Sequence, residues 1–590
     1  MKNRTKALFA LVLALAILAA GCAQQTGPGE AAELYKEGTY TASAQGNNAA
    51  VTVETVFSKD AIVSVTVKEH SETAGISDPP IAQIPEAIVA GQTLAVDAVT
   101  GATNTSKAIL AAVEDCVRQA GGDPELLKQG GPSEETPLET QTLETDVVII
   151  GAGGAGLAAA VSAGENGAKV IVLEKMPDVG GAMSLSSGLM LVAGTEQQKA
   201  AGITEDSQQV YIDDIYARSG GKGDLELITT LCTSANDAMT WLGQNGLVWS
   251  DEVQTKPDCS FPRTHLPIKP EGATGALGDV YVKALQKSAT ENYGAQILLN
   301  TKGVELMQDE AGKVIGVVAE NAADGIRYEI SAASVVMATG GFAGNPDMAR
   351  SYDKMIPDNA DYYAHPGATG DGIVMGQAVG AELIGMEYIK SILSRTGATR
   401  DIKNAIFVNA EGNRFFDEDG KAEDLNAAIY AQTNSNCYMI YDSRTVGEVT
   451  ESIQKMLDNG TLFAGETLEE LAGKIGVDGA NLVKTVEAYN PVAKGETADA
   501  FGRTTLGNTI EVGPFYAAER HVQVHYTMGG LKINSTAQVI GADGSPIEGL
   551  YAAGEVTGGI HGVYRVGGNA ITDCMVFGRI AGISAASAAK

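Results

Sequence analysis

A glycine-rich segment of this 590-residue chain has the residue types and the spacing to hold the phosphates of a dinucleotide. Gly151, Gly153 and Gly156 form the pattern GxGxxG directly after the β-branched run 146–150. The first glycine permits a tight turn, the second admits a pyrophosphate, and the third lets a helix pack closely on the strand. Glu174 ends the next strand-like run and can accept hydrogen bonds from ribose hydroxyls. The spacing predicts a dinucleotide-binding unit whose ligand is NAD or FAD.

The segment that ends at Thr103 has the composition of a phosphate-binding turn. Asp97–Thr103 reads DAVTGAT, and its small residues leave room for a phosphate near the backbone. A helix that starts near Thr105 would direct free N–H groups toward that phosphate. The motif resembles the FMN-binding domain in which the FMN phosphate is joined to a threonine hydroxyl, which implies covalent FMN on Thr103. The run His70–Thr73 resembles a second element of that domain and is expected near the isoalloxazine.

Later motifs favour FAD over NAD at the dinucleotide site. ATGG at 338–341, ATGDG at 368–372, the run 549–555 and GGNAI at 567–571 resemble the fumarate reductase/succinate dehydrogenase flavoprotein superfamily, over about 146–590. The resemblance implies noncovalent FAD, because 180–188 contains no histidine for attachment. With the motifs above, it assigns cofactor binding to Thr103, Gly151, Gly153, Gly154, Gly156, Glu174, Lys175, Gly181, Ala338, Thr339, Gly340, Asp371, Glu555, Asn569 and Ile571.

Two further motifs carry the expected substrate site. HYTMGG begins at His525, and HGVYRVGGN contains Arg565. The resemblance implies that both side chains bind the substrate carboxylate, and the planar fork of arginine suits two oxygens. The family's second-carboxylate histidine falls on Ile392, and its Thr-Glu pair falls on Gly397–Ala398. We therefore expect one position that binds a carboxylate and a second, apolar position beside it.

The proton donor of the family is missing. Its arginine falls on Ala422, so other acids must be considered. Tyr526 and Tyr564 are the candidates, because an arginine nearby lowers the pKa of a phenol. Three basic residues near this region are further candidates to replace the missing arginine, although each is interpreted as a surface charge; they are Lys390, Arg395 and Arg400.

These features predict a reductase of an activated C=C bond in an enoate or enone. FMN on Thr103 would pass electrons to FAD, which implies a membrane electron donor and a flavin transferase as partners. Two alternatives remain open. One is a flavin dehydrogenase that desaturates a ketosteroid-like substrate, with a tyrosine as base or acid. The other is a flavin electron carrier without a working substrate site.

The N-terminus predicts export and a lipid anchor. Three basic residues precede the uncharged apolar stretch 7–20, which is too short to span a membrane. The run LAAGC at 18–22 resembles a bacterial lipobox, which implies a lipidated Cys22 and an extracytoplasmic protein tethered to the membrane. The alternative is an ordinary signal peptide.

Composition excludes several other classes. Lys and Arg total 41 against 73 Asp and Glu, so the net charge of −32 is wrong for a general nucleic-acid binder. No two of the six cysteines form CxxC, which disfavours a zinc ribbon, a cysteine-ligated iron–sulfur cluster and an attached haem.

The motifs require two kinds of supporting fold. Strand-like and helical runs alternate through 146–590, as in a large α/β unit. We therefore predict a Rossmann-type FAD-binding domain with an inserted capping domain, preceded by a small α+β FMN-binding domain. In the small domain, strands are expected at 50–56 and 61–67 and a helix at 106–119. The predicted boundaries are a signal peptide at 1–21, a tether at 22–34, the FMN-binding domain at 35–120, a linker at 121–145, the FAD-binding domain at 146–385 and 524–590, and the capping domain at 386–523.

Overall fold

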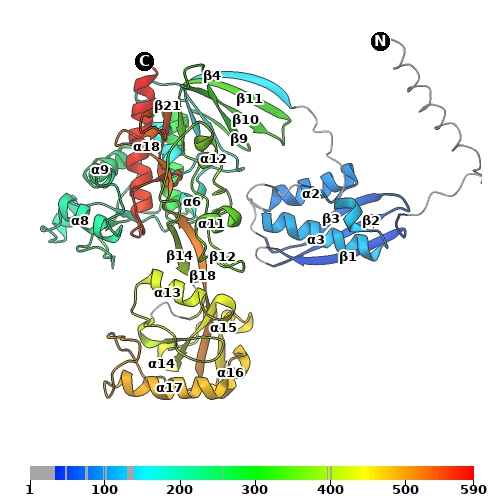
Figure 1. Ribbon diagram of the computed structural model, residues 1–590, viewed down its shortest axis with the longest axis vertical. Helices are drawn as coiled ribbons and strands as arrows, with labels where there is room; N and C mark the ends of the chain where they lie inside the picture. Colours follow the sequence, from blue (N-terminus) through cyan, green and yellow to red (C-terminus); the bar gives the residue numbers. More distant parts are fainter. Residues whose placement is uncertain are drawn as a thin grey trace, which may run out of the picture. The chain divides into compact units, whose positions relative to one another are not determined.

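The computed structural model of the chain divides into two compact units, Met1–Glu134 and Glu135–Lys590 (Figure 1). It describes residues 34–46, 49–72, 77–96, 99, 103–128, 138–256, 258–394, 396–398 and 402–590, without the side chains of Pro79 and Thr103. The predicted signal peptide with Cys22, and most of the turn before Thr103, lie outside the described residues. Within the described residues, no helix is both long and apolar enough to cross a membrane.

The first unit is the predicted small α+β domain. Its antiparallel sheet has the order β1 (Gly38–Gln45), β2 (Ala50–Phe57), β3 (Ile62–Glu69). Every second residue of β2 is buried, as expected of a strand with one face on a core. The helices α2 (Asp78–Gly91) and α3 (Thr103–Gln119) cover that face. The predicted strands and helix are therefore confirmed, while β1 and α2 were not predicted.

The FAD-binding domain is built on a sheet of eight strands. Six of the strands are neighbours in the order β20 (Gln538–Ile540), β21 (Pro546–Ala552), β11 (Ile326–Met337), β4 (Glu139–Ile150), β5 (Val170–Leu173) and β8 (Gln296–Leu298). The other two strands branch from β11, because β10 (Val314–Asn321) pairs with β11 and β9 (Lys302–Gln308) pairs with β10. The strands from β21 to β8 are parallel, so the ends that follow β4, β11 and β21 meet at one edge. This arrangement confirms the predicted α/β fold.

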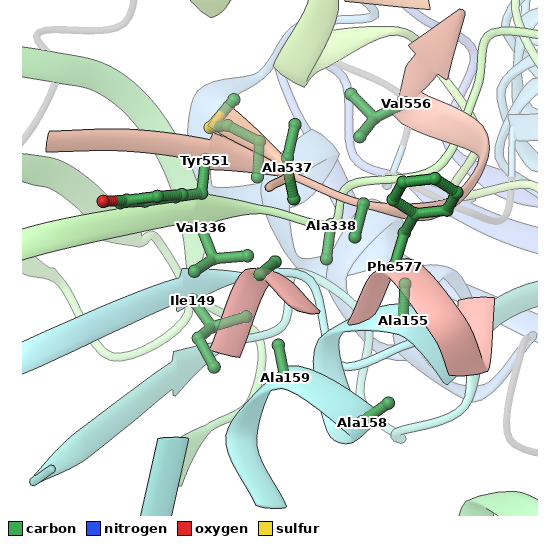
Figure 2. Packing of buried hydrophobic residues seen from close by; sticks show 14 of the residues in the cluster. Ile149, Ala155, Ala158, Ala159, Val336, Ala338, Ala537, Tyr551, Val556 and Phe577 are labelled. Atoms are coloured by element: carbon green, nitrogen blue, oxygen red, sulfur yellow. The ribbon is translucent and has the colours of Figure 1, made fainter. Parts of the chain in front are cut away.

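Two helices cross the sheet beside that edge. α5 (Gly154–Glu165) is rich in alanine, and α18 (Asn569–Ala588) packs directly on it because glycines of α18 lie opposite α5. Figure 2 shows Ala155, Ala158 and Ala159 of α5 in one apolar cluster with Phe577 of α18 and the sheet residues Ile149 and Val336. The other helices of the domain are α6 (Gly181–Ser184), α7 (Glu196–Ala200), α8 (Gln208–Arg218), α9 (Leu225–Gln244), α10 (Gly278–Lys287), α11 (Pro346–Tyr352) and α12 (Asp371–Ala378).

The capping domain has its own sheet and two apolar cores, one on each face. The residues of β16 (Asn436–Asp442) alternate between them, so that Met439 belongs to one core and Ile440 to the other. The remaining elements are β15 (Ile406–Val408), α13 (Ala422–Tyr430), α14 (Ser443–Val446), α15 (Glu451–Asp458), β17 (Phe463–Gly465), α16 (Leu468–Ile475) and α17 (Gly479–Ala493).

Two paired strands join the capping domain to the FAD-binding domain. β18 (Phe515–Thr527) pairs with β16 in its first half and with β14 (Ile389–Leu393) in its second half. Figure 1 shows β18 extending from the capping sheet toward the large domain. The motif residues His525 and Tyr526 are thus on the last part of a strand that belongs to both domains.

The linker predicted at 121–145 is wrong at both ends. α4 (Pro124–Lys128) belongs to the first unit, and β4 begins at Glu139. The polar residues 139–145 belong to the strand because β4 pairs with β11 along its whole length. Most of these side chains are exposed or half-buried, which suits polar groups. The acidic composition of the segment had favoured a solvated loop, but backbone pairing with β11 decides its structure.

Candidate active site

The glycine turn after β4 has the geometry that its motif predicted. Gly151 has a φ of +107°, and a Cβ on it would lie 2.3 Å from the carbonyl oxygen of Ala338. A Cβ on Gly156 would lie 1.8 Å from the carbonyl oxygen of Gly151. A Cβ on Gly153 would lie 3.9 Å from the carbonyl oxygen of Gly180, an ordinary van der Waals distance. The space beside Gly153, at the N-terminus of α5, fits a pyrophosphate.

Glu174 holds this turn in place from the end of β5. Its buried carboxylate accepts hydrogen bonds from the backbone N–H of Ala152, at 2.8 Å, and of Met176, at 2.9 Å. Burial raises the pKa of the carboxyl group, and these two donors oppose that rise. The predicted hydrogen bonds from ribose hydroxyls to Glu174 stay a prediction.

Lys175 and Asp371 connect two of the predicted cofactor motifs. The Lys175 ammonium lies 2.5 Å from the Asp371 carboxylate and 2.6 Å from the Thr369 hydroxyl. Lys302 lies 3.1 Å from the second oxygen of Asp371. Burial works against ionisation of Asp371, but the two lysines and Thr369 outweigh it and lower its pKa. The carboxylate is therefore charged and fixed at the start of α12.

Several buried polar atoms at the sheet edge lack partners among the described residues. The Thr339 hydroxyl, after β11, and the Asn569 amide nitrogen, at the start of α18, are two of them. Tyr211 donates a 2.6 Å hydrogen bond to the Asn569 side-chain oxygen, so the unpaired amide nitrogen has a fixed direction. Unpaired buried donors are costly, and a ligand that accepts from them removes that cost. These atoms fit a cofactor that lies across the edge.

Glu555 completes the cofactor residues near this edge. It is partly buried after β21 and accepts hydrogen bonds from the backbone N–H and the hydroxyl of Thr527, at 2.9 and 3.2 Å. Burial raises the pKa of its carboxyl group to about 7. Of the other predicted cofactor residues, Gly154 and Ile571 lie in the first turns of α5 and α18, Gly181 opens α6, and Ala338 and Gly340 flank Thr339. The predicted FAD motifs thus converge on one edge.

Arg565 is a buried cation with unused donors. Its guanidinium lies over the Tyr526 ring, 4.3 Å from the centroid. One donor makes a 3.3 Å hydrogen bond to the Val566 carbonyl oxygen, and Nε has no partner among the described residues. A buried guanidinium without a carboxylate partner fits an anionic ligand.

His525 faces a different set of neighbours from Arg565. Its Nδ1 lies 2.8 Å from the Tyr363 carbonyl oxygen, and its ring is stacked on Tyr363 with centroids 5.8 Å apart. Successive side chains of a strand point to opposite faces, and Tyr526 is buried while His525 is partly exposed. The contacts described for His525 and Arg565 share no partner, so the two-residue clamp stays a prediction.

The expected lowering of the tyrosine pKa values is wrong. Burial raises the pKa of Tyr526 well above its usual value, and the nearby Arg565 offsets this only in part. Burial also raises the pKa of Tyr564. The cost of burying a phenolate exceeds the attraction of the arginine, so both phenols keep their protons more firmly than in water.

Lys390 is not a surface charge, contrary to its interpretation from the sequence. Only 8% of it is exposed, and its ammonium donates a 2.9 Å hydrogen bond to the Arg565 carbonyl oxygen. The ammonium also lies 3.8 Å from the centroid of the Tyr564 ring. Burial, with Arg565 next, lowers the pKa of Lys390 to about 6. Arg395 and Arg400 lie outside the described residues.

Arg218 is a site residue that the sequence did not reveal. It ends α8, lies 3.6 Å from the Tyr564 ring centroid, and forms a two-bond ion pair with Glu423 at 2.8 and 3.0 Å. Glu423 follows Ala422 at the start of α13, so this pair joins the capping domain to the FAD-binding domain. Glu423 is 205 residues away from Arg218 in the sequence, and no local pattern indicates this contact.

In the small domain, two predicted FMN elements meet. The buried Glu72, from the His70–Thr73 run, accepts a 2.5 Å hydrogen bond from the Thr105 hydroxyl in the first turn of α3. α3 itself begins at Thr103, the predicted attachment residue. The helix start and the upstream element therefore border the same place, which fits a phosphate near Thr103.

Comparisons with known proteins define the class to which this fold and site belong. The FAD binding domain family matches residues 146–571, and the FMN-binding domain family matches residues 46–118. The chain is thus a flavoprotein with FAD and FMN as cofactors. It belongs to the fumarate reductase/succinate dehydrogenase flavoprotein superfamily, and it is an oxidoreductase with an N-terminal FMN-binding domain.

Two curated relatives resemble nearly the whole chain. A urocanate reductase of Eggerthella lenta is 37% identical over 93% of this chain and 92% of its own length. An NADH:acrylate oxidoreductase of Vibrio harveyi is 34% identical over 93% of this chain, which spans only 61% of that longer relative. Activity, substrate and partners are therefore matters for proposal.

Two solved structures share the fold of the chain. The open conformation of a flavocytochrome c3 fumarate reductase has a TM-score of 0.68, 33% identity and 81% coverage of both chains. The 3-ketosteroid-Δ4-(5α)-dehydrogenase of Rhodococcus jostii RHA1, in complex with 4-androstene-3,17-dione, has a TM-score of 0.62 and 27% identity, covering 77% of this chain and 99% of that one.

Proposed function

We propose that the protein reduces an activated C=C bond of an enoate or enone. The observation that carries this proposal is the buried Arg565, which has unused donors and no carboxylate partner among the described residues and lies beside the cofactor residues. Such a cation can bind the carboxylate or carbonyl that activates the double bond. The names of the relatives, a urocanate reductase and an acrylate oxidoreductase, support the same class of reaction.

The residues of the chain have separate parts in this reaction. Gly153, Glu174 and Asn569 are placed to hold FAD, and bound FAD in its reduced form supplies a hydride. Arg565 orients the substrate and stabilises the negative charge that develops on its carboxylate or carbonyl. The Tyr526 ring under the guanidinium excludes water from that contact, which strengthens it.

The second binding position favours a substrate other than fumarate. Ile392 and Gly397–Ala398 stand where the family binds a second carboxylate, and neither can pair with one. We therefore propose one carboxylate or carbonyl with an apolar or aromatic tail. Efficient fumarate reduction by the wild-type protein would contradict this assignment.

The reverse chemistry is the second candidate function. The likeness to the ketosteroid dehydrogenase structure supports it. Turnover separates the candidates. A reductase oxidises reduced methyl viologen when an enoate or enone is added, a dehydrogenase reduces an oxidised dye with a saturated ketosteroid, and an electron carrier does neither.

We also propose how electrons reach the site. FMN joined to Thr103 would receive electrons from a membrane donor and pass them to noncovalent FAD, after a flavin transferase attaches the FMN. Lipidated Cys22 would hold the protein at the outer face of the bacterial membrane. Cys22→Ser should release the protein into the soluble fraction. Sedimentation of this variant with salt-washed membranes would reveal a different tether.

A further inference from the structure

We propose that Lys390 is the proton donor of this reduction. The inference rests on the proposed function. The reaction adds a hydride and a proton across the double bond. The β-carbon accepts the hydride from the reduced flavin, the α-carbon accepts a proton from the Lys390 ammonium, and the resulting amine regains a proton from water. The double bond gains two electrons, and the flavin loses them.

The position of Lys390 compensates for Ala422. The methyl group of Ala422 has no proton to give, and it opens α13, where Glu423 holds Arg218 over the Tyr564 ring. The Lys390 ammonium lies over the same ring, at 3.8 Å. It also contacts the backbone of Arg565 at 2.9 Å. Lys390 therefore lies between the substrate-binding arginine and the place that the missing donor would occupy.

Arg218 is unsuited to this role although it lies nearby. Two hydrogen bonds tie it to Glu423, and Asp258 lies 3.2 Å from its Nε. Burial opposes its charge, but the two carboxylates raise its pKa further above its usual value, so the guanidinium keeps its proton. Lys390 has no ion pair with any carboxylate in the part of the chain that the structure describes, and its proton is easier to release.

The groups around Lys390 set when it is charged. Burial lowers its pKa most, Arg565 and Arg218 add to this, and two carboxylates oppose it. A substrate carboxylate bound to Arg565 brings a negative charge close to Lys390. This charge raises the pKa of Lys390 and favours its protonated form. The titratable and charged groups that face it are Arg218, Asp258, Glu423, His561, Tyr564 and Arg565.

Kinetics of matched variants test the proposal, once the dye assay has identified a substrate of the wild-type protein. Lys390→Met should lower kcat by roughly 100- to 10,000-fold, the usual contribution of a general acid. Lys390→Arg should restore part of the loss. Ser391→Ala, on the same strand, should stay within about twofold of wild type because its hydroxyl contacts only Tyr430 weakly, at 3.5 Å. Flavin absorbance must show full FAD in each variant.

The pH profile adds a signature that a structural role would not produce. Only the protonated form of Lys390 is competent, so wild-type kcat/KM should fall as the pH rises above about 6. That limb should vanish in Lys390→Arg, whose guanidinium stays charged. Tyr564→Phe should keep the limb, since the tyrosine is not the donor.

A second readout does not depend on turnover. Competitive labelling of lysines with acetic anhydride over a pH series, followed by peptide mass spectrometry, reports the pKa of each amine in the purified holoprotein. Lys390 should be half-reactive near pH 6, and the exposed Lys222 serves as the internal reference for labelling.

Each result supports or overturns the inference. Unchanged kcat with a raised KM in Lys390→Met would assign Lys390 to substrate binding instead, and an ordinary pKa in the labelling series would remove it as a donor. A loss of the pH limb in Tyr564→Phe would transfer the role to the phenol. If the wild-type protein reduces no enoate or enone, the proposed function fails, and the labelling result still stands by itself.

Discussion

At the scale of single residues, the site depends on burial of cations without carboxylate partners. Arg565 and Lys390 are both nearly buried, and the described structure gives neither of them an ion pair. Burial and the positive charge of Arg565 disfavour the charged form of Lys390 and lower its pKa until an anion arrives. Binding of the substrate carboxylate offsets this effect, so affinity for the anion is built into the folded protein.

Arg565→Ala should be the most damaging single substitution. It removes a charge-assisted contact from a water-poor site, at a cost on the order of 2–5 kcal/mol in transition-state binding. This corresponds to a roughly 30- to 5,000-fold fall in kcat/KM. Arg565→Lys should recover only part of the loss, because an ammonium lacks the fork. Near-wild-type turnover in a fully flavinylated Arg565→Ala protein would place the substrate elsewhere.

The residues that the sequence identified correctly differ from those it missed in the range of their contacts. Gly156 packs against the nearby Gly151, and Gly151 has a φ of +107° in the turn itself, so the local spacing carries the signal. The burial of Lys390 depends on Arg565, which is 175 residues away, and that of Tyr526 on the packing of several elements. Such contacts arise only in the folded chain, which explains the wrong interpretations of Lys390 and of the tyrosine pKa values.

At the scale of elements, the glycines of the β4–α5 turn have two separable roles, which are packing of the turn and binding of FAD. Gly156→Ala would place a methyl group against the Gly151 carbonyl, so it should destabilise the protein by about 3 kcal/mol or more, even without FAD. Gly153→Ala meets no protein atom closer than 3.9 Å. It should leave the melting temperature of the apoprotein unchanged while weakening FAD binding. Equal destabilisation of both apoproteins would show that Gly153 is structural.

The contact between α8 and α13 links the FAD-binding and capping domains through side chains. Arg218 and Glu423 are 20% and 39% exposed, so solvent screening limits their coupling to about 1 kcal/mol. Glu423→Gln should therefore speed hydrogen exchange in α13 about fivefold, and Arg218→Met should add little to that variant. Glu451→Gln, on the exposed surface of α15, is the matched control. Additive effects of Arg218→Met and Glu423→Gln would mean that the pair does not couple the domains.

At the scale of the whole molecule, the chain combines two flavin domains, and only part of their structure could be predicted from the sequence. The small domain and the Rossmann-type unit follow local patterns, such as the alternation in β2 and the run before Gly151, and both could be predicted. The polar start of β4 and the sharing of β18 between two domains could not, because strand pairing over long separations decides them. The net charge of −32 does not indicate a specific partner, but it disfavours binding to other polyanions.

Thr103→Ala tests how the two flavin domains depend on each other. The variant should lose covalent FMN, because no hydroxyl remains at the attachment residue, while FAD stays bound in the second unit, whose residues are unchanged. Denaturing gel fluorescence measures the first effect, and absorbance of the released flavin measures the second. Reduction by methyl viologen should persist, since a small dye can reach FAD directly, whereas reduction by membranes should stop if FMN is the relay. Thr105→Ser, which keeps the hydroxyl that bonds Glu72, is the matched control. A fluorescent band that survives Thr103→Ala would place the attachment on another residue.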